Sequence, residues 1–108
     1  MCRILVSLLP LVVLVLAAAG PDGSIIAHDG NGDGALACVV CHGQRFQGTA
    51  AIRAPALAGL PTATILARLA HFAGPNGHNA AMRQVATALS PAERRAVAGY
   101  LAGLPPTH

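Results

Sequence analysis

The residues of this chain that could do chemistry stand together in one short run: Cys38, Cys41 and then His42. A Cys-x-x-Cys-His run is typical of covalent haem attachment. Its two thiols lie about one helical turn apart, so they could form thioethers with the two vinyl groups of one porphyrin. The imidazole of His42 could then ligate the iron. The motif therefore predicts one covalently bound haem c with its iron.

Two other uses of the same cysteines agree less well with the sequence. A thioredoxin-like redox pair requires a βαβ context, whereas the flanking residues show helix and loop patterns. A structural zinc site requires four ligands, and Cys2 is the one cysteine outside the motif. Because Cys2 falls in a segment that we expect to be removed, we favour haem over zinc or dithiol chemistry.

The second axial ligand would decide what such a haem does. Met82 is the only methionine after Met1, and it lies at the start of a helical stripe. A thioether ligand raises the reduction potential of haem iron, which suits an electron carrier. His71 and His78 are the alternative ligands and would give a bis-histidine haem. An open site, with His78 assisting gas binding or peroxide turnover, is a further alternative.

The run from Asp29 to Gly34 follows the D-x-N-x-D-G pattern that opens a calcium loop. The twelfth position of that loop would be Val40, where a bidentate Glu is required. We therefore expect a solvent-exposed turn with a capping role instead of a calcium site. The remaining histidines, His28 and His108, fall in expected tails and carry no prediction.

The first twenty residues have the layout of a secretory signal peptide. Arg3 supplies a positive charge, an apolar stretch follows over residues 4–19, and small residues stand at its end. The stretch is short for a membrane span, which needs about 20 residues. We expect residues 1–20 to be cleaved after export. A retained anchor is the alternative, and it would be the only link to a membrane.

Composition and charge exclude other classes of function. Arg3 accounts for one of the three net positive charges, and two haem propionates would balance the rest. The apparent basicity therefore gives no case for nucleic-acid binding. Large apolar side chains are scarce, with one Tyr, two Phe and no Trp, so a buried porphyrin would complete a small core. Three arginines could neutralise propionates or line a docking surface: Arg45, Arg53 and Arg83.

Helical periodicity without strand alternation predicts an all-α fold of three to five short helices around the haem. We expect a flexible Gly-rich lead-in over residues 21–32, one domain over residues 33–104 and a tail over residues 105–108. Asp33 is expected to cap a short helix that carries the haem motif and ends at Gly43.

Three further helices are expected beyond a loop over residues 44–61. The first begins near Thr62 and stops at Gly74, and the second carries Met82. The last has the strongest signal, because Ser90, Pro91 and Glu93 form a capping box with proline at the first helical position.

From Asp33 to Leu104 the residues resemble a class I c-type cytochrome, similar to the small monohaem or tandem cytochromes of the c553 and c4 type. The resemblance rests on the segment that begins at Cys38 and includes Gly43, on the Pro-x-Leu-x-Gly-like run from Pro55 to Gly59, and on Met82 with the helix that follows.

The resemblance implies a role for each matching residue. Cys38 and Cys41 would hold the haem, and His42 and Met82 would ligate its iron. The Pro55 carbonyl would accept a hydrogen bond from the His42 ring, which fixes a ligand's tautomer.

It also implies a bacterial periplasmic electron carrier that is not itself an enzyme. Its partners would be redox proteins, a donor dehydrogenase and an acceptor oxidase or reductase. The alternative is a cytochrome subunit of a larger dehydrogenase or oxidase complex.

One position departs from the family pattern. Many members have an aromatic residue four positions before the first cysteine, inside a longer first helix, whereas this chain has Gly34. We therefore expect a short first helix and a weakened crossing with the last helix, across which Tyr100 would pack.

Overall fold

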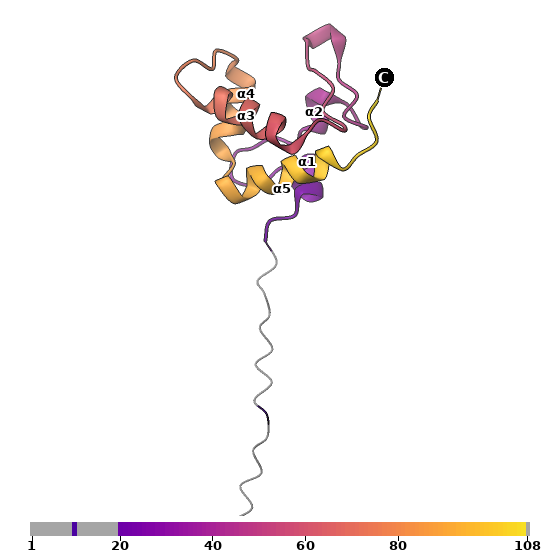
Figure 1. The fold of residues 1–108 in the computed structure, drawn as a ribbon. Coiled ribbons are helices and arrows are strands. Elements are labelled where there is room, and N and C mark those ends of the chain that lie inside the picture. The colour runs from indigo at the N-terminus through magenta and orange to yellow at the C-terminus, as the bar shows by residue number, and fades with distance from the viewer. Residues whose placement is uncertain (1–9, 11–19, 108) are drawn as a thin grey trace, which may run out of the picture.

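The computed structural model describes Pro10 and residues 20–107. Within these residues the chain forms five α-helices and one 3₁₀-helix, and its only β-type pairing is an isolated bridge between Thr49 and Ala54. The predicted all-α fold is therefore confirmed. In chain order the helices are α1 Gly23–Asp29, α2 Val39–His42, the 3₁₀-helix Ala50–Ile52, α3 Thr62–Ala73, α4 Ala80–Ala88 and α5 Pro91–Ala102 (Figure 1).

The expected signal peptide lies outside the described residues, apart from Pro10 and Gly20. No helix in the described part of the chain combines the length and the apolar character that crossing a membrane requires.

The expectation of a flexible lead-in over residues 21–32 is wrong. Residues Gly23–Asp29 form helix α1, and the Asp22 carboxylate caps it by accepting hydrogen bonds from the backbone N–H groups of Ser24 and Ile25. Ile26 and Ala27 of this helix are buried in the core. Burial of these two side chains stabilises the helix. The glycine-rich composition of the segment gives no sign of this burial.

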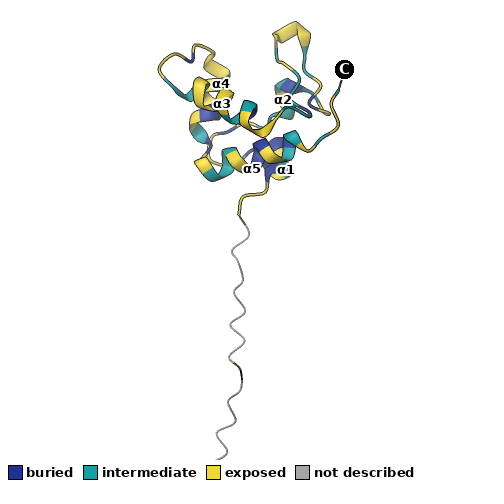
Figure 2. Cartoon of the chain, in the orientation of Figure 1, coloured by how far each residue is buried: buried dark blue, intermediate teal, exposed yellow. Residues whose placement is uncertain are grey.

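Helix α1 crosses the last helix, α5, at very short range. A Cβ on Gly23 would overlap the backbone carbonyl of Ala96, so only glycine allows this approach. Tyr100 of α5 reaches back to α1, where its hydroxyl lies 3.1 Å from Nε2 of His28. Figures 1 and 2 show α1 against α5, with buried residues where they meet. The expected weakening of this crossing is wrong, because α1 precedes the haem motif as a separate helix.

A single apolar core joins α1 and α5 to the middle of the described chain. Phe46, Val97 and Leu101 are its largest fully buried side chains. Helices α3, α4 and α5 pack around it, and α3 contributes Ile65 and Leu69. The helices expected near Thr62 and Met82 are thus present, and Gly74 ends α3.

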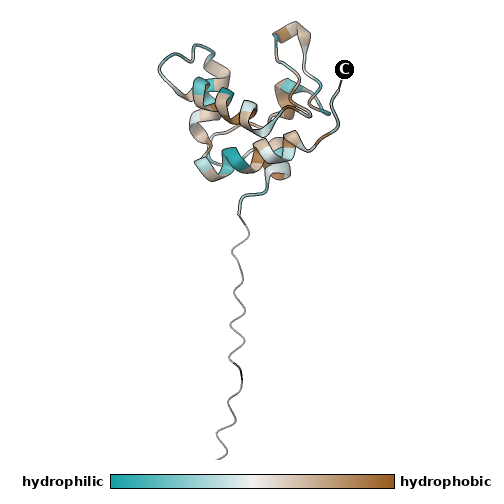
Figure 3. Cartoon of the chain, viewed as in Figure 1, coloured by the Kyte–Doolittle hydropathy of each residue, from teal (hydrophilic) through white to brown (hydrophobic). Residues whose placement is uncertain are grey.

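Helix α5 begins as its sequence predicts. The Ser90 hydroxyl accepts a hydrogen bond from the backbone N–H of Glu93, and the Glu93 carboxylate accepts one from the backbone N–H of Ser90. Hydrophilic residues gather in the first half of the helix (Figure 3). The second half carries the buried residues that meet α1 and α3.

Candidate haem site

The two cysteines are presented by a helix of one turn. Val39–His42 form α2, in which the backbone N–H of His42 donates to the carbonyl of Cys38 over 2.9 Å. Gly43 ends the helix with a φ of 92°, a left-handed backbone conformation that favours glycine. The expected capping by Asp33 is wrong, because Cys38 occupies the N-cap position and makes no side-chain cap.

The segment before α2 is organised by Asn31 instead. Its Oδ1 accepts hydrogen bonds from the backbone N–H groups of Asp33 and Ala35 over 2.9 and 3.0 Å. Its Nδ2 donates to the carbonyl of Ala88 over 2.8 Å. Among the described residues, no group of three or more His, Cys, Asp or Glu side chains could hold a metal ion.

The loop after α2 returns Pro55 to the side of His42. Phe46 is buried with a φ of 54°, and its carbonyl accepts hydrogen bonds from the backbone N–H groups of Leu57 and Ala58 over 2.8 and 3.2 Å. These hydrogen bonds hold the part of the loop that follows Pro55 against Phe46.

The His42 ring is fixed by its neighbour in that loop. Nδ1 of His42 lies 2.8 Å from the carbonyl oxygen of Pro55. Because a carbonyl oxygen can only accept, Nδ1 is the protonated nitrogen, and Nε2 keeps its lone pair. Such a contact is typical of histidines that ligate metals. The hydrogen bond that the family resemblance implies is therefore present in the structure.

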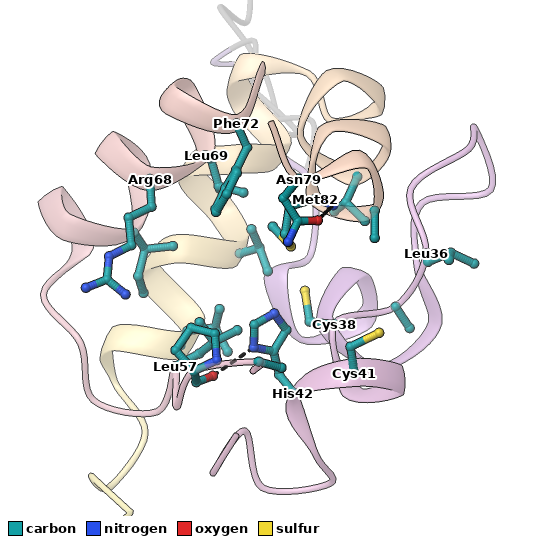
Figure 4. A pocket seen from close by; sticks show the side chains of 18 of the residues that line it. Leu36, Cys38, Cys41, His42, Leu57, Arg68, Leu69, Phe72, Asn79 and Met82 are labelled. Carbon is teal, nitrogen blue, oxygen red and sulfur yellow. Dashed lines mark hydrogen bonds between the residues drawn. The ribbon is translucent and has the colours of Figure 1, made fainter. Parts of the chain in front are cut away.

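The His42 imidazole lines a cavity of about 520 Å³. Its volume lies within the usual range of ligand pockets, about 300–1,000 Å³. Cys38, Cys41 and His42 line it from one side, and Met82 lines it from α4 (Figure 4). The rest of the wall is mainly apolar and includes Leu57, Ile65, Leu69, Phe72, Val97 and Leu101.

The competing histidines do not reach this cavity. His71 is exposed on α3 with its ring against Phe72, and His78 is exposed in the loop before α4. Neither is among the residues that line the cavity, whereas Met82 is. The structure thus brings together all five predicted site residues, namely Cys38, Cys41, His42, Pro55 and Met82.

The Cys38 thiol lies in apolar surroundings. Burial raises the pKa of this thiol above its ordinary value, and a hydrogen bond from its backbone opposes the change in part. The neutral thiol is therefore favoured at neutral pH, which is not the environment of a reactive thiolate. The surroundings suit a cysteine held against an apolar group better than a redox-active dithiol.

Of the three arginines proposed from the sequence, only Arg53 lines the cavity. Arg83 donates from Nη1 to the carbonyl of Gly74 over 2.7 Å, and Arg45 lies in the exposed loop. Sequence reasoning missed Arg68, which lines the cavity from α3. No local pattern in the sequence marks this place, because it depends on how α3 packs.

Two other residues have a position that the sequence did not reveal. His28 was expected in a tail, but its ring lies in α1 against Phe46 and Tyr100, with centroid distances of 5.3 and 6.0 Å. Asn79 lines the cavity and is the N-cap residue of α4, three residues before Met82.

The residues present fit a haem c. The cavity is mainly apolar, and it is lined by two free cysteines, by an imidazole with an available Nε2 and by a methionine. The thiols, the imidazole and the thioether are the groups that hold c-type haem and its iron.

Two curated proteins are similar to this chain in sequence. The chain is 35% identical over 94 residues to a thiosulfate dehydrogenase electron acceptor of Stutzerimonas stutzeri, a match that covers 86% of the chain and 44% of the relative. It is 38% identical over 73 residues to the protein of the same name from Thiomonas intermedia, covering 68% of the chain and 34% of the relative. The chain therefore spans less than half the length of these curated relatives. No family model matches the chain.

Three solved structures are similar to this chain in fold. Cytochrome c4 of Acidithiobacillus ferrooxidans superposes with a TM-score of 0.70 at 32% identity, over 76% of this chain and 47% of that one. Thiosulfate dehydrogenase of Marichromatium purpuratum superposes with a TM-score of 0.74 at 30% identity, over 78% of this chain and 18% of that one. Cytochrome c4 of Pseudomonas stutzeri superposes with a TM-score of 0.69 at 30% identity, over 77% and 46% of the two chains.

Proposed function

The chain is a class I c-type cytochrome, and we propose that it carries single electrons in the bacterial periplasm through one covalently bound haem c. The observation that carries this proposal is the apolar cavity with Cys38, Cys41 and His42 on one side and Met82 on another. The cavity is lined by residues from the loops and from α2, α3, α4 and α5, so the fold is built around it.

Each site residue has a separate role in this proposal. Cys38 and Cys41 would hold the haem through thioethers, while Nε2 of His42 and the sulfur of Met82 would ligate its iron. The Pro55 carbonyl keeps the His42 ring in the required tautomer. The haem, when bound, supplies an iron that takes up and releases one electron. The apolar wall would exclude water from the haem. The polarity around a haem is one of the factors by which a protein sets its reduction potential.

Two arginines at the cavity support the placement of the acidic groups of the haem. Arg53 and Arg68 are both exposed and both line the cavity, from the loop and from α3 respectively. A guanidinium at a solvent-facing rim suits a carboxylate, because it can donate two hydrogen bonds to one group. We therefore assign these two arginines to the haem propionates in place of Arg45 and Arg83.

A thiosulfate-oxidising dehydrogenase is the electron donor that we propose. The two curated relatives are electron acceptors of thiosulfate dehydrogenase by name. An exposed apolar side chain outside the cavity also supports contact with a protein partner, since Val40 of α2 is 67% exposed and does not line the cavity. With few charges at this site, docking would depend mainly on apolar contact and only weakly on salt.

A purified thiosulfate dehydrogenase tests this donor directly. Catalytic amounts of the enzyme, mixed with thiosulfate and the ferric holoprotein, should reduce the holoprotein, as followed by its optical spectrum. Thiosulfate without enzyme is the control for direct reduction. If the enzyme reduces other acceptors but leaves this protein oxidised, the assignment of donor is wrong while the electron-carrier function still stands.

A subunit role is the second candidate, because one of the solved structures that superposes is itself a thiosulfate dehydrogenase whose chain is far longer. Size-exclusion chromatography of the mixed proteins separates the two candidates. A stable joint peak favours the subunit, and separate peaks with rapid electron transfer favour the carrier.

A further inference from the structure

Asn79 contacts the backbone of Met82 and also lines the cavity. It stands at the N-cap of α4, with extended backbone angles of −90° and 109°. Its Oδ1 accepts a hydrogen bond from the backbone N–H of Met82 over 3.0 Å. Figure 4 shows this bond and the side chain of Asn79 at the cavity. The cap of α4 is therefore made to the same residue that offers the thioether.

The backbone at Asn79 and in the loop before it is held by further contacts. Its carbonyl accepts a hydrogen bond from the backbone N–H of Arg83 over 2.8 Å, and the Arg83 side chain donates to the carbonyl of Gly74 over 2.7 Å. Gly77 lies against the end of α3, where a Cβ would come within 2.5 Å of the carbonyl oxygen of Phe72. The loop between α3 and α4 is thus fastened before and after Asn79.

Helix α4 is a poor helix without its cap. It has nine residues, which is shorter than an isolated helix needs for stability in water. Its only buried residue is Ala86, in the second half, so packing stabilises the second turn and beyond more than the first. The first turn, which carries Met82, has no fully buried side chain, so the Asn79 cap is the contact within the protein that holds it most directly.

We propose that Asn79 is a positioning residue for the axial ligand Met82, and that opening of its cap and dissociation of Met82 from the iron are one coupled event. The inference depends on the proposed ligation by Met82. Loss of the Asn79–Met82 bond would free the first turn of α4, and a helix cap contributes enough stability to change the fraction of unligated iron by about fivefold.

Imidazole added to the ferric holoprotein measures this fraction. It can bind only when Met82 has left the iron, so its apparent affinity rises in proportion to the open population. Disappearance of the far-red methionine-to-iron band follows the binding. In Asn79→Ala we expect the apparent affinity for imidazole to rise about fivefold, because a cap worth about 1 kcal/mol is lost.

Three matched variants separate positioning from a general loss of stability. Ser90→Ala removes the equivalent cap of α5, which carries no ligand, and should leave the imidazole affinity within about twofold. Asn79→Ser keeps a good cap acceptor and should restore the value of the unchanged protein. Asn79→Gln keeps an amide but places its oxygen too far along for the cap, so it should behave like Asn79→Ala even if the alanine variant yields no holoprotein.

The possible results distinguish the positioning role of Asn79 from the ligation by Met82. Equal effects of Asn79→Ala and Ser90→Ala, or no recovery in Asn79→Ser, would overturn the positioning role although Met82 remains a ligand. A far-red band that is missing in the unchanged protein would instead overturn the ligation by Met82, and the inference with it.

Discussion

Nδ1 of His42 lies 2.8 Å from the carbonyl oxygen of Pro55, and the His42 side chain is only 6% exposed. The contact joins the haem motif to a residue thirteen positions later through a backbone atom of that residue. It leaves Nε2 as the one nitrogen of the ring that is free to bind iron. The proline ring itself takes no part in this hydrogen bond, because the acceptor is the backbone carbonyl.

Replacing Pro55 with alanine should leave the ligation of His42 unchanged. The carbonyl remains in place, so the tautomer and the optical spectrum of the holoprotein should be those of the unchanged protein. The free energy of unfolding should fall by about 0.4–1 kcal/mol, because alanine gives the unfolded chain more freedom. A loss of the far-red band in Pro55→Ala, measured beside denaturant unfolding, would contradict this account of the contact.

Replacing Gly23 with alanine should weaken the crossing of α1 and α5. The new methyl group would overlap the carbonyl of Ala96, and we expect the holoprotein to lose about 1–3 kcal/mol of unfolding free energy. Gly99→Ala in the exposed middle of α5 is the matched control, because no atom lies within 4 Å of its added Cβ. That variant should gain about 0.5–1 kcal/mol. Equal effects at the two glycines would refute the close crossing.

Replacing Asn31 with aspartate should destabilise the segment that leads to the haem motif. The two acceptor bonds to Asp33 and Ala35 could persist, but the donor bond to the Ala88 carbonyl is lost, and a carboxylate would face Glu93. We expect a loss of about 1–3 kcal/mol of unfolding free energy.

Asn76→Asp in the exposed loop before α4 is the control for this variant and should change stability by less than about 0.5 kcal/mol. Denaturant unfolding of both holoproteins measures the difference. A tolerant response at residue 31 would mean that its side-chain bonds do not hold the segment.

The cap of α5 should make stability depend on pH in the acid range. The backbone N–H of Ser90 lowers the pKa of Glu93 below its usual value, with smaller help from the side chains of Asn31 and Ser90 and some opposition from desolvation. The folded state therefore holds the proton less tightly than the unfolded state. The contribution is fully present above the unfolded pKa, about 4.5, and is lost as pH falls through the lower folded pKa.

Thermal unfolding of Glu93→Gln beside the unchanged protein tests this dependence. Glutamine keeps an acceptor for the Ser90 N–H but carries no charge, and other groups cancel in the difference. The unchanged protein should melt at a higher temperature above about pH 5, with a difference that shrinks as the pH is lowered. A difference that stays constant down to about pH 3 would exclude the cap carboxylate as its source.

The sequence is sufficient to predict the elements whose signals are local. The Ser90–Glu93 capping box marks the start of α5, and Gly74 marks the end of α3, because each acts within one helical turn. Cys38, Cys41 and His42 follow from the Cys-x-x-Cys-His spacing and Met82 from the scarcity of methionine, whereas the role of Pro55 follows from the resemblance to the family. A seven-residue helix rich in poor helix formers gives no comparable signal, so α1 is missed.

What the sequence could not predict depends on contacts between distant residues. The stability of α1 comes from Gly23 meeting Ala96, and the order of the next segment comes from Asn31 meeting Ala88. The place of Arg68 at the cavity depends on how α3 packs. None of these contacts has a pattern in the neighbouring residues, because both partners must already be folded together.

The optical spectrum of the holoprotein, produced with a c-type maturation system and recorded oxidised and reduced, shows whether the protein holds a covalent haem with Met82 on its iron. We predict a reduced spectrum of covalent haem c and, in the oxidised protein, the weak far-red band of methionine-to-ferric-iron charge transfer. Met82→Leu, which conserves volume, should keep the haem and lose that band. Haem without the band in the unchanged protein would contradict the ligation by Met82, and the absence of covalent haem would contradict the whole account.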